Sequence, residues 1–318
     1  MRAAQIDTCG RPPRWADRPD PSPGAGELLV RVLAAPITPL DLLCAGGASY
    51  FGAPATPYVP GVQGVGTVDG RLVWFPTPAG MAPGDGSMAE LACVPAGDVV
   101  ELPGGADPVA VAALGLSAVA AYQALTWRGE LAAGEQVLVL GAGGVVGQAA
   151  VQLARVAGAR RVVAAARSAA GRERAEKAGA DAVVALDTDD VAELTHRLSA
   201  ACDGPLDLVL DPLFGAPAAA ALRVLRPHGR LVNLGGSAGE TSPLDSATLR
   251  SRSLRLLGYT NNELTREQRA AAVAKVAELA ASGRLHVDHE AVPLEEVASA
   301  WERQSAGTTA GRLVLTPP

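Results

Sequence analysis

The 318-residue sequence lacks the features that mark several classes of protein. Its four cysteines are widely scattered and none forms a C-x-x-C pair, so a redox or zinc motif of that kind is excluded and reduced thiols are expected. Lysine occurs only twice, no basic cluster is present and the net charge is −6, which gives no support to a nucleic-acid partner. The first residues carry charge and proline where a secretion signal needs an apolar core, and no segment is expected to reach the length of a membrane span. We therefore expect a soluble, cytoplasmic protein with no membrane partner.

Residues 135–167 are the most informative part of the sequence, because they predict a strand, a glycine-rich turn, a helix and a second strand. Residues 136–140 are rich in Val and Leu, as is typical of a buried parallel strand, and helical periodicity follows from Val145. The turn fits the pattern A-x-G-x-x-G, and its context disfavours the alternative of a packing turn in an unrelated protein. Such a turn lets the backbone approach a pyrophosphate at a helix N-terminus. The predicted phosphate-binding residues are Ala142, Gly143, Gly144, Val145, Val146 and Gly147.

The end of the second predicted strand selects the dinucleotide. An acidic residue about twenty positions past the turn would bind the ribose hydroxyls of NAD, whereas an arginine there accommodates the 2′-phosphate of NADP. Arg167 stands at that distance from Gly147, Ser168 follows it, and no carboxylate occurs before Glu173. Arg172 lies close behind and, like Arg167, can form charge-assisted hydrogen bonds with a phosphate. The sequence predicts NADPH as the cofactor, with solvated surface arginines as the alternative reading of this segment.

The pattern of apolar runs changes along the chain and predicts two domains. Before about residue 112, short apolar runs alternate with Gly and Pro, which indicates a β-rich domain with many turns. Strand and helix patterns then alternate to about residue 285, which predicts a doubly wound parallel sheet in an α/β fold. We expect a Rossmann NADP-binding domain at residues 116–285 and a catalytic domain formed by residues 1–115 and 286–318.

This arrangement resembles the medium-chain dehydrogenase/reductase superfamily, in which a Rossmann domain is inserted in a β-rich GroES-like catalytic domain. The glycine turn is the most specific part, because it has one residue more than that of the alcohol dehydrogenases and is similar to that of the zinc-independent quinone oxidoreductase and enoyl reductase branch. The resemblance covers nearly the whole chain. It rests on APITPLD at residues 35–41, YVPGVQGVGTV at 58–68, GAGGVVGQAAVQLAR at 141–155, GAD at 179–181, LVLDPLFG at 208–215, LRPHGRLVNLGG at 225–236 and AGRLVL at 310–315.

The resemblance also predicts that the chain holds no metal. In the zinc alcohol dehydrogenases of the superfamily, a cysteine lies just before the equivalent of Asp41, and a His-Glu pair follows the equivalent of Gly61. Thr38, Val62 and Gln63 occupy these places here, and none is a useful zinc ligand. Without a Lewis acid, hydride transfer is easier to an activated acceptor. The expected activity is therefore NADPH-dependent reduction of a small-molecule enone or quinone, including a tailoring enoyl reduction on a polyketide-like intermediate.

Candidate acceptor-binding residues follow from the same resemblance. Similar quinone oxidoreductases usually have Asn at the place of Thr38 and Tyr at the place of Leu43, and both are replaced here. A second family Tyr has a counterpart in Tyr50, within one position. We expect Tyr50 to donate a hydrogen bond to the substrate carbonyl, with Thr38, Asp41 and Gln63 lining the site. The alternatives are a helix cap for Asp41 and an ordinary loop aromatic for Tyr50.

Further cofactor contacts are implied near the nicotinamide, with packing or solvation as the alternative for each. A homodimer is also expected, as in many relatives, with residues 253–259 as the candidate pairing edge. Two other functions stay open: a metal-free NADP-dependent alcohol dehydrogenase, and a non-catalytic NADPH-binding protein, since binding alone does not prove turnover. The implied contacts are Asn233, Gly235, Gly236 and Ser237 along the cofactor, Tyr259 near its reactive end, and Arg312 at a position that is commonly Lys.

Overall fold

The computed structural model describes residues 1–47, 49–309 and 311–318 and divides the chain into two compact units. The first unit comprises Met1–Gly115 and Thr265–Pro318, and the second comprises Leu116–Leu264. The second boundary differs from the expected one at residue 285, because helix α8 (Arg266–Ala281) belongs to the first unit. Asp98 of that unit accepts from Arg266 Nε at 3.0 Å and from Arg269 Nη2 at 2.5 Å, which holds the start of the helix in place.

The first unit is β-rich, as the many short apolar runs predict. Its main sheet has the order β14-β15-β3-β4-β5-β7, with β6 also pairing with β3, and β1 pairs with β2. The C-terminal strand β15 pairs with β3, which returns the end of the chain to this unit. The strands are β1 (Arg2–Gln5), β2 (Arg14–Asp17), β3 (Glu27–Pro36), β4 (Gln63–Val68), β5 (Arg71–Pro76), β6 (Leu91–Pro95), β7 (Val100–Glu101), β14 (His289–Pro293) and β15 (Arg312–Thr316), and the helices besides α8 are α1 (Pro39–Ala45), α9 (Val297–Ser305) and the short 3₁₀ turns η1 (Ala96–Asp98) and η4 (Leu294–Glu296).

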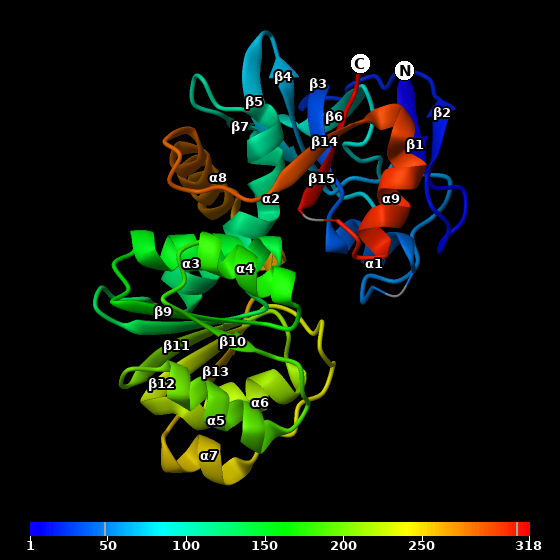
Figure 1. Cartoon of the computed structure of the whole chain (residues 1–318). Helices are drawn as coiled ribbons and strands as arrows, with labels where there is room; N and C mark the ends of the chain where they lie inside the picture. Colours follow the sequence, from blue (N-terminus) through cyan, green and yellow to red (C-terminus); the bar gives the residue numbers. More distant parts are fainter. Residues whose placement is uncertain (48, 310) are drawn as a thin grey trace. The chain divides into compact units, whose positions relative to one another are not determined.

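The second unit is a six-stranded parallel sheet in the order β10-β9-β8-β11-β12-β13, with helices on both faces (Figure 1). Helices α3 and α4 lie on one face, and α5 and α6 lie on the other. Every residue of β8 and of β11 is buried, which is why these strands read as continuous apolar runs. The doubly wound fold is confirmed. The strands are β8 (Gln136–Leu140), β9 (Arg161–Ala166), β10 (Ala182–Ala185), β11 (Leu206–Asp211), β12 (Leu225–Asn233) and β13 (Arg255–Gly258), and the helices are α3 (Val145–Val156), α4 (Ala169–Lys177), α5 (Val191–Ala201), α6 (Gly215–Val224), α7 (Ser246–Ser251) and the 3₁₀ turn η3 (Asn261–Glu263).

One helical segment leads from the first unit into the second. Helix α2 (Pro108–Gln123) continues into a π-helical turn (Ala124–Arg128), and Gly115 interrupts it with φ 33° and ψ −136°. The 21-residue segment contains an 18-residue window with a mean hydropathy of 1.7, so the expectation that no segment reaches the length of a membrane span is wrong by length and composition. In the structure 67% of this apolar window is buried. A buried core helix also meets the length and hydropathy criteria for a membrane span, so they are weak evidence for one.

Candidate functional site

The carboxyl ends of β8 and β11 mark the place where the winding of the parallel sheet reverses. From β8 the chain moves outward to β9 and β10, whereas from β11 it moves the other way to β12 and β13. The turns that follow β8 and β11 lie against each other, since a Cβ added to Gly141 would lie 3.0 Å from Pro212 Cγ. Ligands of open α/β sheets bind at such a switch point. The predicted glycine turn is therefore in the position that a dinucleotide requires.

The glycine turn brings backbone segments into close contact. A Cβ on Gly147 would lie 2.4 Å from Ala142 Cα, so this glycine lets α3 pack directly on the end of β8. A Cβ on Gly143 would lie 2.6 Å from Gly171 Cα, so α4 packs on the same turn. Gly144 is different, because a Cβ there would meet only Gly141 O, at 3.6 Å. Space therefore remains beside Gly144, at the N-terminus of α3.

The first turn of α3 offers unused donors. Gly144 is the N-cap and provides no side-chain cap. Within the described part of the chain, no hydrogen bond uses the N–H groups of Val145, Val146 or Gly147. Unsatisfied amides and the helix dipole together favour an anion at this end. The donor set and the open space at Gly144 fit the pyrophosphate of a dinucleotide.

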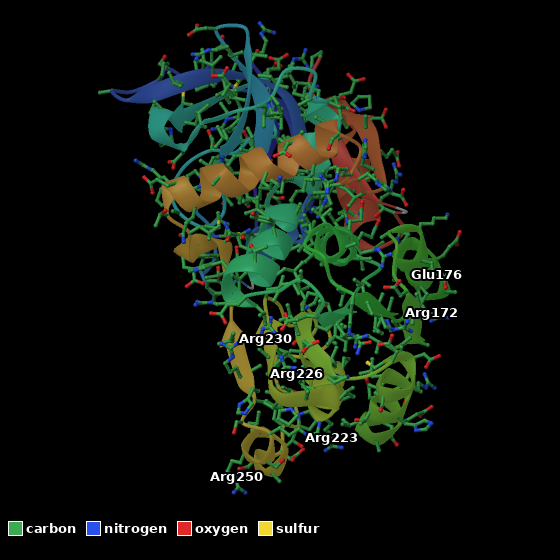
Figure 2. The ribbon with its side chains drawn as sticks, turned by 90° about the vertical axis from the view of Figure 1, so that its left-hand side faces the viewer. Arg172, Glu176, Arg223, Arg226, Arg230 and Arg250 are labelled. Carbon is green, nitrogen blue, oxygen red and sulfur yellow. The ribbon has the colours of Figure 1, made fainter. Side chains whose placement is uncertain are left out.

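The residues after β9 add positive charge beside the turn. Arg167 is exposed, and none of the ion pairs or hydrogen bonds of the described residues uses its guanidinium. Arg172 lies on α4 (Figure 2). Its Nη1 donates to Arg167 O at 2.8 Å, and Ser168 caps α4 by accepting from Gly171 N at 3.0 Å. Glu173, the first carboxylate that follows, pairs with Lys177 at 2.8 Å. The segment can thus offer a guanidinium to a phosphate without a competing free carboxylate at its start.

Arg174 has a role that its position in the sequence does not reveal. Its Nε donates to Gly143 O at 2.9 Å, so this arginine fastens α4 to the glycine turn. Of the three arginines after β9, Arg174 therefore supports the turn, whereas Arg167 keeps its charged group exposed.

The loops after β11 and β12 are tied together by Asn233. Its Nδ2 lies 3.0 Å from Asp211 Oδ2 and 2.8 Å from Gly235 O. Asp211 is fully buried and also accepts from the N–H of Phe214 at 2.9 Å, and burial raises the pKa of this carboxyl. Ser237 Oγ donates to Pro212 O at 3.1 Å. The buried carboxylate of Asp211 thus holds Asn233, whereas Ser237 is held by a backbone oxygen.

The other two predicted cofactor residues of this loop are glycines, which can act only through their backbone. Gly235 and Gly236 allow close approach of the chain, since a Cβ would lie 2.9 Å from Pro212 O at Gly235 and 3.0 Å from Glu240 Oε1 at Gly236. Asp211 was missed as an organising residue. The available signal was the final Asp of the apolar run LDLVLD, followed by Pro.

Tyr259 lies just beyond β13 and is 8% exposed. Its hydroxyl donates to Asn261 Oδ1 at 2.7 Å, and Asn261 Nδ2 donates to Leu116 O at 3.0 Å. Trp127 packs on its ring edge to face, with the centroids 6.3 Å apart. Burial raises the pKa of Tyr259, so the phenol stays neutral at ordinary pH.

Thr38 and Asp41, two of the predicted acceptor residues, lie together in the first unit. They form the capping box of α1: Asp41 Oδ2 accepts from Thr38 N at 2.8 Å and from Thr38 Oγ1 at 2.6 Å. Asp41 Oδ1 accepts from Val62 N at 2.9 Å, which joins the start of α1 to the residue before Gln63. Burial raises the pKa of Asp41, and these hydrogen bonds oppose that effect. Asp41 therefore caps a helix, which is the alternative to a role in acceptor binding that the sequence left open.

The other predicted residues of the first unit differ sharply in exposure. Gln63 is 1% exposed and its Oε1 accepts from Trp74 Nε1 at 2.9 Å. Tyr50 is 79% exposed and its ring lies 4.3 Å from that of Phe51. Tyr50 therefore reaches solvent, whereas Gln63 is enclosed.

Arg312, which was predicted near the cofactor, is 3% exposed in β15 of the first unit. Its Nη1 donates to Ile37 O at 2.9 Å, one residue before the capping box of α1. Burial lowers the pKa of Arg312 to about 10, and the charge of Asp41 opposes this. The structure thus groups Arg312 with Thr38 and Asp41 inside the unit. The sequence pattern AGRLVL predicts the final strand, but it does not predict that the side chain of Arg312 is buried.

A protein site for a metal ion needs several suitable side chains close together. Among residues 1–47, 49–309 and 311–318, no three His, Cys, Asp or Glu side chains lie close enough together to hold a metal ion. Thr38 and Gln63, at two of the superfamily's zinc positions, bond instead to Asp41 and Trp74.

A Rossmann unit with an uncapped phosphate helix, joined to a GroES-like β unit, defines the class as a medium-chain dehydrogenase/reductase. Residues 145–278 match the family model described as zinc-binding dehydrogenase. Quinone oxidoreductase of Lama guanicoe is 31% identical, over 99% of this chain and 97% of its own. Prostaglandin reductase-3 of Mus musculus is 29% identical, over 95% of this chain and 84% of its own. The quinone oxidoreductase of Thermus thermophilus, whose structures include an NADPH complex, is 31% identical with a TM-score of 0.81, covering 99% of this chain and all of that one.

The chain belongs to the zinc-independent quinone oxidoreductase branch of the medium-chain dehydrogenase/reductase superfamily. It is an oxidoreductase.

Proposed function

We propose that this oxidoreductase reduces the activated C=C of an enone, or a quinone, without zinc. NADPH is its cofactor. The observation that carries the cofactor assignment is the exposed guanidinium of Arg167, beyond β9 and without an ion-pair partner in the described chain. The uncapped N-terminus of α3 supports it, because it supplies donors for the pyrophosphate.

The proposed class of acceptor follows from the residues at the superfamily's zinc positions in the first unit. Once bound, the reduced nicotinamide supplies a hydride. In an enone the β-carbon would take the hydride, the C=C π pair would shift to the bond between the α-carbon and the carbonyl carbon, and the C=O π pair would move to oxygen. The carbonyl would form again as the α-carbon takes a proton from solvent or a protic group. Such an acceptor spreads its own developing charge, which suits a site whose superfamily zinc positions hold Thr38, Val62 and Gln63.

The chain's own contribution is to bind the acceptor and stabilise the oxyanion. We assign Tyr50 as a hydrogen-bond donor to the carbonyl, and its high exposure leaves the phenol accessible to a ligand. Thr38 and Asp41 position α1 through their capping box, and Gln63 is held by Trp74. Asn233 ends β12, Ser237 follows that strand and Tyr259 follows β13, and the proposed cofactor contacts of these three residues rest on those positions.

The substitution Arg167→Ala is expected to raise the dissociation constant of NADPH and to leave that of NADH unchanged. A lost charge-assisted hydrogen bond costs about 1.5–3 kcal/mol, which is about tenfold or more in affinity. Fluorescence titration of both nucleotides measures the ratio. Arg172→Ala is the matched comparison, because its guanidinium is already bonded to Arg167 O and a smaller effect is expected. An unchanged NADPH-to-NADH ratio in Arg167→Ala would show that this arginine does not read the 2′-phosphate.

The substitution Tyr50→Phe is expected to lower turnover on enones about tenfold, because one donor to the developing oxyanion is lost. Initial rates of NADPH oxidation with 2-cyclohexen-1-one measure it. A melting temperature equal to that of the unmodified chain controls for a change in loop packing. Full turnover by Tyr50→Phe on every accepted enone would remove the donor role.

The finer assignment that we propose is a dedicated step on a particular enone, including a polyketide-like intermediate, rather than general quinone reduction. The residues usual in similar quinone oxidoreductases are replaced here by Thr38 and Leu43, and Leu43 is 43% exposed. A higher kcat/KM for one extended enone than for simple quinones would support this. Equal values across the panel would favour generic reduction.

We also propose a cytoplasmic homodimer. Strand β13 is at the edge of the six-stranded sheet, and Leu256 on it is 40% exposed. An exposed edge with unpaired backbone groups can pair with its symmetry mate. Sedimentation velocity should give twice the chain mass of 32.2 kDa, and a monomer at micromolar concentration would contradict the dimer.

A further inference from the structure

A pocket lies entirely within the first unit, between residues 51–58 and residues 80–85. Its volume is about 480 Å³, within the range of about 300–1,000 Å³ that is usual for small-molecule sites. Phe51, Pro54, Pro57 and Met81 supply apolar walls. The pocket therefore suits a ligand with an apolar body.

The charged groups at the rim are already compensated. Arg18 Nη2 donates to Asp85 Oδ2 at 2.9 Å, and Arg18 Nη1 donates to Gln5 Oε1 at 3.1 Å. Asp85 Oδ1 accepts from Val59 N at 2.8 Å. Because Arg18 and Asp85 neutralise each other, the pocket offers no net charge to a ligand. An uncharged ligand is favoured.

Tyr58 supplies a polar group within these walls. The residue is 5% exposed and lines the pocket. A Cβ added to Gly80, another lining residue, would lie 3.4 Å from Tyr58 Oη, which places the hydroxyl at the wall. No hydrogen bond of the described residues uses Tyr58 Oη, and this oxygen is not sealed from solvent. A buried phenol without a protein partner is a donor that lacks an acceptor.

The state of this phenol suits donation. Burial raises the pKa of Tyr58, and the nearby charge of Asp41 raises it further. The hydroxyl therefore keeps its proton at ordinary pH and donates to an acceptor oxygen.

We infer that this pocket binds the uncharged acceptor molecule, with Tyr58 Oη donating to a carbonyl oxygen and Phe51 and Met81 packing against the apolar body. That the ligand is the hydride acceptor rests on the proposed function. The existence of a ketone-binding pocket does not. The two ideas can therefore fail separately.

The test uses the full chain without cofactor and two unreactive probes, 1-tetralone and its carbonyl-free analogue tetralin. Isothermal titration calorimetry is expected to show saturable binding of both, with 1-tetralone tighter. Tyr58→Phe should raise the dissociation constant of 1-tetralone about two- to tenfold, the range of one neutral hydrogen bond, and leave that of tetralin unchanged. A melting curve equal to that of the unmodified chain shows that the variant is folded.

A second variant keeps the inference testable if Tyr58→Phe does not fold. Ala82 is exposed at the pocket wall, so Ala82→Trp fills the space and should weaken both probes more than tenfold. The matched control is Ala306→Trp, which occupies a separate hollow of about 460 Å³ beside Leu42 and Trp301 and should change neither.

Three results would overturn the inference: no saturable 1-tetralone binding to the unmodified chain, unchanged 1-tetralone affinity in folded Tyr58→Phe, or unchanged affinity for both probes in Ala82→Trp. If the probes behave as expected but no enone or quinone is reduced, the pocket stands and the proposed function fails.

Discussion

Replacing Gly147 by alanine is expected to lower NADPH affinity about a hundredfold, equal to about 2.8 kcal/mol, and to lower the melting temperature. The added Cβ would lie 2.4 Å from Ala142 Cα and 2.5 Å from Gly141 O. Both contacts are with backbone, so relief requires α3 to move away from the end of β8. That movement displaces the amides of the first turn, which are the proposed pyrophosphate donors. Fluorescence titration with NADPH and a thermal melt without nucleotide measure the two effects.

Gly144→Ala is the matched control for this experiment. Its Cβ would meet only Gly141 O at 3.6 Å, and its φ of −84° and ψ of 169° suit any residue. The fold should therefore keep its melting temperature. If the pyrophosphate approaches the turn at this glycine, NADPH affinity should still fall, since the added methyl occupies that space. Unchanged NADPH affinity in both variants would place the cofactor elsewhere.

Replacing Arg230 by methionine is expected to cost about 3–5 kcal/mol of unfolding free energy, the usual loss when one member of a buried ion pair is removed. Arg230 is 3% exposed, and its Nη2 lies 2.6 Å from Glu135 Oε2 and 2.9 Å from Glu130 O. Its Nε donates to Gly129 O. Arg226, on the same strand (Figure 2), pairs with Asp207, and its Nη2 lies 3.7 Å from Glu135 Oε1, which is too long to replace the hydrogen bonds of Arg230. Urea unfolding followed by far-ultraviolet circular dichroism measures the loss.

The control for Arg230→Met is a surface arginine–glutamate ion pair with a similar nitrogen–oxygen distance. Arg303 and Glu290 lie 2.5 Å apart with side chains 43% and 51% exposed, so Arg303→Met should cost far less unfolding free energy than Arg230→Met. A double variant, Arg230→Met with Glu135→Met, should recover part of the loss, because it also removes the carboxylate that has lost its two hydrogen-bonding partners on Arg230. Equal losses for Arg230→Met and Arg303→Met would mean that burial does not govern the pair.

The glycine turn and the alternation of strands and helices could be predicted because their signals are local. A run such as residues 136–140 followed by Gly141, Gly144 and Gly147 specifies backbone approach, whatever the rest of the chain does. The α/β class, the β-rich unit and the family were therefore accessible from sequence. The end of the Rossmann unit could not be predicted from the sequence. The helical pattern of α8 is the same in either unit, and its place in the first unit depends on contacts with the distant Asp98.

The candidate site was less predictable, because exposure depends on which elements pack together. Arg312 is expected as a cofactor contact from its place in AGRLVL, yet β15 lies beside β3 and the side chain is enclosed. Tyr58 and Tyr50 are chemically alike in the sequence, but one is 5% and the other 79% exposed. The bond from Arg174 to the glycine turn joins two elements that periodicity alone cannot bring together. Such contacts need the fold.

The central claim is metal-free transfer of hydride from NADPH to the β-carbon of an enone. The most direct measurement reduces 2-cyclohexen-1-one with NADPH deuterated at the transferring C4 position, using dialysed protein whose zinc content is determined in parallel. The claim predicts one deuterium at C3 of cyclohexanone and zinc far below one atom per chain. Oxidation of alcohols with NADP⁺ in place of enone reduction, or tight NADPH binding without turnover, would favour the two alternative functions. Stoichiometric zinc retained through dialysis, or product without deuterium at C3, would contradict the claim.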